Sequence, residues 1–208
     1  MSRSPSTRPK ARAAGAAGPS TRRRGTELTQ AIFEATLREL AEKSFEELSF
    51  DSIAPAAGTG KSVLYRRWST TAELVLAALK DHEAGLGRPV VPDTGTLRGD
   101  LIVILSTLAR ILDQPRGRAL RPLLAQRARH PELFEQIMDQ VVRPHRATML
   151  ECIRSAADQG QADPARATER IAAVGPRLII AECLETGSVS DADVVLVVDE
   201  VLLPLLTP

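Results

Sequence analysis

The sequence predicts an all-α fold in which a small N-terminal domain precedes a larger helical domain. Three observations lead to this prediction. Apolar residues recur at spacings of three and four along the candidate helices, and 43% of the residues are hydrophobic, which is ample for a core. Helix-capping signals open several of these segments. The one run that favours a strand by propensity, residues 194–198, follows such a capping signal and has no partner strand.

Residues 1–24 are predicted to form a disordered basic arm, because they consist almost entirely of Ser, Pro, Ala, Gly and Arg. The arm holds seven of the 27 basic residues and no acidic residue, so the remaining chain carries 20 basic and 26 acidic residues. Attraction to a nucleic acid would therefore have to come from the arm and from one local face. Arg24, next to the first helix, is a candidate for such a contact; a solubilising tail is the equally weighted alternative.

The first helix is predicted over residues 26–43, where Phe33, Leu37 and Leu40 recur at intervals of four and three. Residues 49–79 then form a short helix, a tight turn, a second short helix and the start of a third. Ser49 is suited to cap the first of these, and Gly58 stands where the turn needs a positive φ. A capping box, Thr70 to Glu73, opens the third.

The second short helix, predicted from Lys61 to Arg67, carries a compact group of cations and hydroxyls on its outer face. Phosphate contacts and the base edges of the major groove require such a group. The pattern predicts a DNA-binding helix-turn-helix. Its predicted contact residues are Arg24, Ser49, Thr59, Gly60, Lys61, Ser62, Tyr65, Arg66 and Thr71.

These residues resemble the TetR family of transcriptional repressors. The resemblance covers residues 25–80 and is carried by Ala31–Ala35, Ile53-Ala54, Ala57-Gly58, Leu64-Tyr65, Arg66-Arg67-Trp68, Thr70 and Leu74. It implies a TetR-like fold of about nine helices, with a helix-turn-helix domain at 25–80 and a helical ligand-binding and dimerisation domain at 81–208. It also implies a homodimeric repressor that a small molecule releases from a near-palindromic operator. The sequence departs from the family pattern at Ser44, Pro55, Thr59, Gly60 and Thr71.

Two other interpretations of the motif remain open. Residues 55–62, PAAGTGKS, differ from the phosphate-binding P-loop pattern GxxxxGK[ST] only at Pro55, and residues 194–200 could then form the strand on its Mg²⁺ side. However, a P-loop must follow a buried strand, and the residues before Pro55 do not form one. The second alternative is a helical adaptor that has lost DNA binding, which Pro55 and Thr71 keep open.

The remaining chain is predicted to be helical. A loop rich in Gly and Pro at 85–96 precedes helices at 97–113 and 116–128, a long helix from Pro131 to Asp158 with a kink near Pro144, a helix at 163–185, and a last helix that Ser190 caps and that runs to about Leu206. The last two helices are apolar on more than one side, which predicts an interface. The predicted dimer residues are Ile171, Val174, Leu178, Val194, Val198, Val201 and Leu202.

A ligand pocket is expected among the helices between residues 97 and 185. Its candidate residues are Arg110, Gln126, His145, Met149, Cys152 and Arg177, although surface or structural roles fit each of them more readily. Phe134 is the only aromatic residue after Trp68. Walls without aromatic rings suit an aliphatic ligand or one of modest size better than a flat cationic drug.

Catalytic and metal-binding patterns do not occur in the sequence. HExxH, GxSxG and CxxC are absent, and His82, His130 and His145 lack metal-ligand spacing. We therefore expect no enzyme, no cofactor and no metal. The chain has no run of about eighteen apolar residues and no secretory signal, so we expect a cytoplasmic protein without a membrane partner. Cys152 and Cys183 are expected to be reduced.

Overall fold

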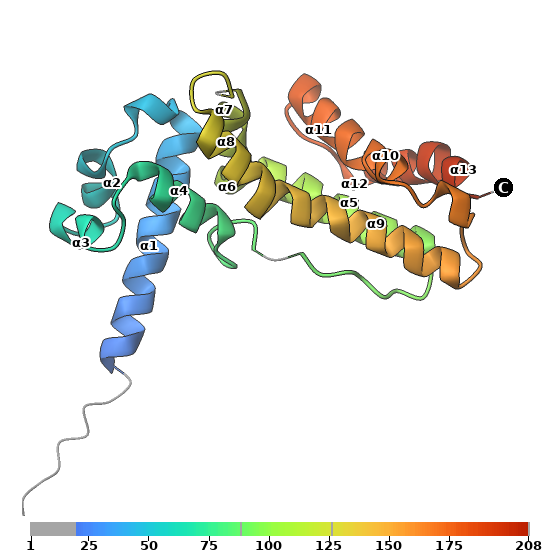
Figure 1. Ribbon diagram of the computed structural model, residues 1–208, viewed down its shortest axis with the longest axis horizontal. Helices are drawn as coiled ribbons and strands as arrows, with labels where there is room; N and C mark the ends of the chain where they lie inside the picture. The colour runs from blue at the N-terminus through green and yellow to red at the C-terminus, as the bar shows by residue number, and fades with distance from the viewer. Residues whose placement is uncertain (1–19, 88, 126, 208) are drawn as a thin grey trace, which may run out of the picture.

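The computed structural model describes residues 20–87, 89–125 and 127–207. These residues form helices joined by turns and loops and contain no strand, which confirms the all-α class. Helices α1–α4 lie at one end of an elongated molecule, and the helices from α5 onwards extend to the other end (Figure 1). When segments separated by at most one residue are joined, except across the extended Gln114, after which Pro115 begins a new helix, the described residues form nine helices besides two short 3₁₀ turns, in agreement with the prediction.

The N-terminal domain consists of α1 (Ser20–Glu42), α2 (Phe50–Ala56), α3 (Lys61–Tyr65) and α4 (Thr71–Lys80), with a 3₁₀ turn at Phe45–Glu47. Helix α1 begins inside the predicted arm, so the disordered interpretation is wrong for residues 20–24. These five residues contain neither Gly nor Pro, and arginine favours helix. Residues 1–19 lie outside the described part of the chain. Helix α3 ends two residues before the predicted Arg67.

Capping side chains fix where these helices begin. The Ser49 hydroxyl accepts a hydrogen bond from the Ser52 amide at the start of α2. The Thr70 hydroxyl accepts one from the Glu73 amide at the start of α4. The Glu73 carboxylate in turn accepts the amide of Ser69 at 2.8 Å. Both predicted caps are therefore confirmed, each stabilising its helix by about 1 kcal/mol.

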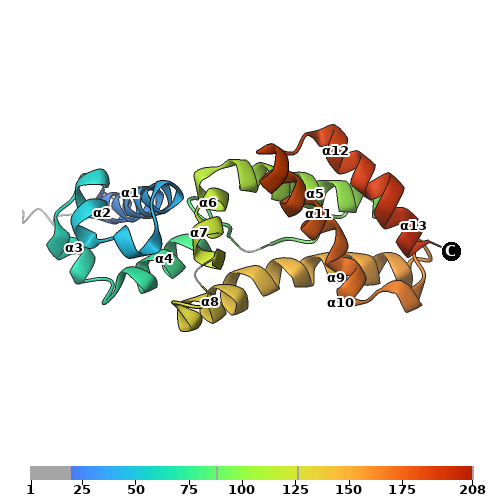
Figure 2. The ribbon, with the colours of Figure 1, turned by 90° about the horizontal axis from the view of Figure 1, so that it is seen from above.

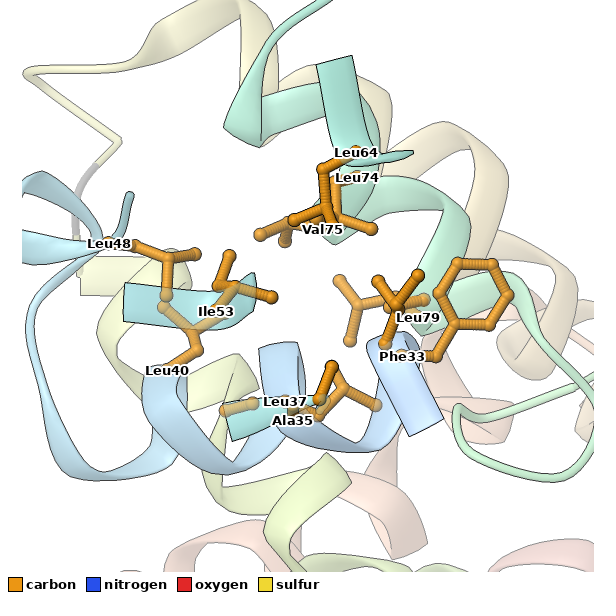
Figure 3. Close-up of a cluster of buried hydrophobic side chains, with 14 of the residues drawn as sticks. Phe33, Ala35, Leu37, Leu40, Leu48, Ile53, Leu64, Leu74, Val75 and Leu79 are labelled. Carbon is orange, nitrogen blue, oxygen red and sulfur yellow. The ribbon is translucent and has the colours of Figure 1, made fainter. Parts of the chain in front are cut away.

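A cluster of buried apolar side chains holds α1, α2, α3 and α4 together (Figure 3). Leu37 and Leu40 of α1, Ile53 of α2, Leu64 of α3 and Leu74 of α4 are all at most 1% exposed. The stripe predicted on the first helix is thus the base of this core. The same cluster includes Ala119, Leu123, Leu133, Ile137 and Val141, so its packing crosses the domain boundary predicted at residue 80.

The C-terminal domain begins with α5 (Leu97–Asp113), whose bounds agree with the prediction. It continues with α6 (Pro115–Arg118), α7 (Leu120–Ala125), α8 (Pro131–Ile137), a π-helical segment η2 (Met138–Val142), α9 (Arg143–Asp158), a 3₁₀ turn η3 (Pro164–Arg166), α10 (Glu169–Ala172), α11 (Val174–Thr186), α12 (Asp191–Leu196), a second π-helical segment η4 (Val197–Leu202) and α13 (Leu203–Leu206). The helix predicted at 116–128 is interrupted at Ala119. The helix predicted at 163–185 begins only at Glu169, because Pro164 starts the 3₁₀ turn η3 instead, and it is interrupted at Ala173.

Both π-helical segments end just before a proline inside a long helix. Pro144 follows η2 by two residues, and Pro204 follows η4 by two residues. Proline has no N–H and its ring collides with the carbonyl four residues earlier, and a widened turn relieves this collision. The predicted irregularity near Pro144 is therefore a π-helical turn inside one continuous helix from 131 to 158.

Helices α5 and α9 extend side by side along the C-terminal domain, and α11 and α12 pack against α5 (Figure 2). A second buried cluster fills the space between them, with Leu101 and Leu105 of α5, Met149 and Ile153 of α9, and Ile179 of α11 each at most 1% exposed. None of the helices that the structure describes is both long enough and apolar enough to cross a membrane.

The structure corrects part of the predicted dimer surface. Val194, Val198 and Leu202 are at most 2% exposed, because they point into the core of their own chain. Ile171, Val174 and Val201 are half-buried, and only Leu178 of the predicted set is exposed. The sequence analysis missed three exposed apolar side chains on the same helices: Ile180 and Leu184 on α11 and Leu196 on α12.

Candidate DNA-binding surface

The turn between α2 and α3 has the geometry that the sequence predicts. Gly58 has a φ of +65°, a left-handed conformation that residues with a side chain adopt at a cost. The amide of Thr59 donates to the carbonyl of Ala54 at 2.9 Å, which closes the end of α2. Gly60 then precedes α3 in an extended conformation. Helix α2 continues through Pro55, which is exposed, so this proline does not disrupt the motif.

Four of the predicted contact residues form one exposed face of α3. Lys61, Ser62, Tyr65 and Arg66 are all exposed, while Leu64 on the opposite side is fully buried. The Tyr65 side chain is 62% exposed, and its ring meets the ring of Phe50 edge-on at a centroid distance of 4.8 Å. Contact with this buried ring restricts how Tyr65 extends from the helix.

An acidic residue that the sequence analysis missed lies next to this face. The Lys61 ammonium forms an ion pair with the Asp51 carboxylate of α2, and both side chains are more than half exposed. The sequence already contained a sign of this partner, because Asp51 is the only acidic residue between Glu47 and Glu73. The ion pair lowers the positive charge that Lys61 offers to phosphate.

The remaining predicted contact residues flank α3. Ser49 and Thr71 are half-buried near the N-termini of α2 and α4, and the Ser49 hydroxyl is engaged in its cap. Thr59 is half-buried and Gly60 is exposed in the turn. Arg24 belongs to α1, but its side chain lies outside the described part of the structure.

Arg67 and Trp68, which follow α3, both contact α1, although Arg67 is itself exposed. The Arg67 guanidinium donates to the Thr29 hydroxyl of α1 and lies 6.0 Å from the centroid of the Trp68 ring. The Trp68 ring packs against Phe33 at a centroid distance of 5.7 Å. The Trp68 ring therefore packs the motif against α1.

The structure contradicts the P-loop interpretation of residues 55–62. A P-loop connects a buried strand to a helix. Here the residues before the loop form helix α2, and residues 194–200 belong to α12 and η4 rather than to a strand. The similarity to the P-loop pattern is therefore confined to the sequence.

Comparison with known families decides the identity of this helix-turn-helix protein. The family model described as "Bacterial regulatory proteins, tetR family" matches residues 32–78, and the model described as "Tetracyclin repressor-like, C-terminal domain" matches residues 91–201. The chain belongs to the TetR family. It is a DNA-binding transcriptional regulator of the helix-turn-helix type, as the resemblance of residues 25–80 predicted.

Curated TetR-family proteins and solved structures resemble most of the chain. A DNA-binding transcriptional repressor, TetR, of Mycobacteroides abscessus is 34% identical over 201 residues, which cover 89% of this chain and 97% of the relative. An uncharacterized HTH-type transcriptional regulator of Mycobacterium bovis is 31% identical over 177 residues, 85% of this chain and 86% of the relative.

Two solved structures share the fold. The TetR family transcription regulator SCO0332 aligns with a TM-score of 0.61 at 24% identity, over 88% of this chain and 100% of that chain. The flavonoid-responsive regulator FrrA aligns with a TM-score of 0.59 at 17% identity, over 88% of this chain and 98% of that chain.

The predicted ligand residues of this TetR-family regulator do not line one pocket. Met149 and Cys152 lie in the C-terminal core at 1% and 2% exposure, and burial raises the pKa of the Cys152 thiol to about 11. Arg110 is exposed on α5. The half-buried His145 ring shares a hydrogen bond with the Val141 carbonyl at 2.8 Å. Gln126 falls outside the described residues.

Among the described members of that set, Arg177 lines a groove that the others do not reach. It borders a groove of about 820 Å³ between α9, α10 and α11. The other predicted ligand residues were chosen as polar groups on apolar helices, and this criterion does not tell a core position from a groove position. The arginines that share the groove with Arg177 were missed: Arg143 and Arg146 are three residues apart in the sequence, but only the fold brings them to Arg170 and Arg177.

Proposed function

We propose that this TetR-family regulator is a homodimeric repressor that binds a near-palindromic operator through α3 and leaves it when a small molecule binds the C-terminal domain. The observation that carries the proposal is the exposed face of α3, where Lys61, Tyr65 and Arg66 stand together above a buried Leu64. Such a protein acts on DNA in the cytoplasm and needs no catalytic group.

The roles on α3 follow from its chemistry. Lys61 and Arg66 are suited to neutralise phosphates, and the Tyr65 hydroxyl is suited to donate to a phosphate oxygen. Ser62 and Gly60 leave room for close approach to base edges at the start of the helix. The half-buried Thr71 provides a hydroxyl without a charge, so fewer ionic contacts are expected here than a lysine at this position would give.

Dimerisation is supported by exposed apolar side chains on the last helices. Leu178, Ile180 and Leu184 of α11 and Leu196 of α12 are between 38% and 60% exposed. Large apolar side chains that remain exposed on adjoining helices are typical of an interface. A symmetric pair would present two α3 helices to half-sites about one helical turn apart, about 34–36 Å.

Relatives support the repressor and ligand parts of the proposal. The Mycobacteroides abscessus relative is a transcriptional repressor, and FrrA is flavonoid-responsive. For the present chain, the same activities require that the ligand bind the released conformation more tightly than the DNA-bound conformation.

Selection of bound fragments from the source genome by the purified full-length protein tests the proposal. We expect enrichment of a short near-palindrome, with an affinity that falls steeply as salt rises and is unaffected by ATP. Absence of enrichment at low salt would favour a helical adaptor without DNA binding, and dependence on ATP would contradict the regulator mechanism.

A further inference from the structure

The groove of about 820 Å³ in the C-terminal domain is lined by arginines from two facing helical surfaces. Arg143 and Arg146 lie three residues apart on α9, and Arg170 and Arg177 lie seven residues apart on α10 and α11. Residues three apart share one face of a helix, so Arg143 and Arg146 point to the same side of α9, and Arg170 and Arg177 line the groove from the other two helices. The two pairs therefore form opposite walls of one groove.

The charge of this groove is largely uncompensated. Among the described residues, Arg146, Arg170 and Arg177 form no ion pair, whereas Arg143 pairs with Asp139 and with Glu135. Glu169 is the only carboxylate that lines the groove. Like charges gathered in one concavity repel one another, and a bound anion removes that repulsion.

The composition of the domain does not explain this cluster. Residues 81–208 contain 14 arginines and no lysine, but they also contain 18 carboxylates, so the domain as a whole is acidic. An acidic domain that lies away from α3 along the molecule is not suited to bind DNA. The arginines therefore point to a smaller anion.

We infer that this groove binds an organic anion, a small molecule with a carboxylate or phosphate group next to a modest apolar body. Guanidinium groups match carboxylate and phosphate in a bidentate geometry. Leu150 and the alanines at 147, 172 and 173 provide apolar surface between the arginines. The volume lies within the range of small-molecule sites, about 300–1,000 Å³.

A contact path connects the groove to the DNA-binding domain. The partners of Arg143, Glu135 and Asp139, lie on α8 and η2, and both of these segments contact α4. Lys80 of α4 also donates to Gln140 of η2 at 2.9 Å. An anion that binds Arg143 competes with its two carboxylate partners and so acts on the segment that supports α4. This regulatory step rests on the proposed repressor function, whereas anion binding does not.

Calorimetric titration of the full-length protein with octyl phosphate tests the site. Octan-1-ol, which has the apolar chain alone, and inorganic phosphate, which has the anion alone, are the comparison compounds. We expect octyl phosphate to bind more tightly than either. The double variant Arg146→Gln/Arg170→Gln should weaken it by about tenfold per arginine, because each removes a charge-assisted hydrogen bond. The matched variant Arg110→Gln/Arg154→Gln removes two exposed arginines outside the groove and should bind like the wild type.

Equal affinity for octan-1-ol and octyl phosphate would overturn the inference, and so would unchanged binding of octyl phosphate in the groove variant Arg146→Gln/Arg170→Gln. A change of oligomeric state in that variant would overturn it as well, because it would place the arginines against a second copy of the chain. The titration contains no DNA, so its outcome is independent of operator binding. In a second measurement, octyl phosphate should weaken operator binding by the wild type and not by the groove variant; an unchanged affinity in both would leave anion binding in place and contradict its regulatory role.

Discussion

Lys61 is the best-placed cation of α3, and its ion pair with Asp51 determines how much of its charge is available to DNA. Both side chains are more than half exposed, so solvent screens the pair and exchange for a phosphate is easy. The sequence predicted Lys61 as a contact from its position on the helix. Asp51 was the only candidate carboxylate near the motif, but the crossing of α2 and α3, which the sequence does not show, decides that it reaches Lys61.

Substitution of Lys61 tests its assignment to a phosphate. We expect Lys61→Ala to weaken binding to all operator sequences alike and to reduce the slope of log affinity against log salt by about one. Asp51→Asn should have the opposite effect and tighten binding, since it frees Lys61. Lys43→Ala, which removes an exposed lysine paired with Glu39 on α1, is the control. A change of sequence preference in Lys61→Ala would show instead that Lys61 contacts a base.

The Tyr65 hydroxyl provides a second test at the same scale. Tyr65→Phe keeps the edge-on contact with Phe50 and removes only the hydroxyl. We therefore expect unchanged thermal stability and an affinity for the operator that is lower by about fivefold to tenfold, the effect of one hydrogen bond. Thermal unfolding measures the stability, and anisotropy titrations on cognate and random fragments measure the affinity. Wild-type affinity in this variant would exclude the hydroxyl from the interface.

At the scale of the element, the turn between α2 and α3 depends on the left-handed conformation of Gly58. A Cβ at this position would meet no atom within 4 Å, so the backbone conformation alone opposes a side chain. We expect Gly58→Ala to lower the free energy of unfolding by about 1 kcal/mol, and Gly58→Asn to lower it less, because Asn tolerates this conformation. Denaturant unfolding measures both, and equal stability of the two variants would contradict the account of the turn.

Helix positions were predictable where a local signal marks each end. Helix α5 begins after Thr96, which accepts the Gly99 amide, and ends before Pro115, so both of its bounds follow from the sequence. The interruptions at Ala119 and Ala173 did not follow, since alanine favours helix and tertiary packing imposes the break. The π-helical turns were predictable only as an irregularity near Pro144.

At the scale of the whole molecule, the sequence showed that the last helices are apolar on two sides but not which side faces the core. Val194, Val198 and Leu202 fill the core, and α5 and α11 cover them. The same spacing of apolar residues would also have fitted a fold in which the other side of these helices faced the core. The groove arginines were missed for a similar reason, because their two helices meet only in the folded chain.

The exposed apolar residues of α11 and α12 provide a test of the proposed dimer. Leu184→Glu places a charge on a side chain that is 60% exposed, so the fold of each chain should be retained while the interface loses apolar contact. We expect a shift from dimer to monomer in sedimentation and weaker operator binding. Val90→Glu, an equivalent change at an 82% exposed position in the connecting loop, should remain dimeric. A dimer in both variants would place the interface elsewhere.

Footprinting on the genomic fragment with the highest affinity tests the central claim most directly, that paired α3 helices bind one operator. The account predicts two protected half-sites with centres about one helical turn apart, about 34–36 Å. Protection should disappear in Lys61→Ala/Arg66→Ala at protein concentrations where that variant is still dimeric. A single protected half-site, or protection that this variant retains, would contradict it.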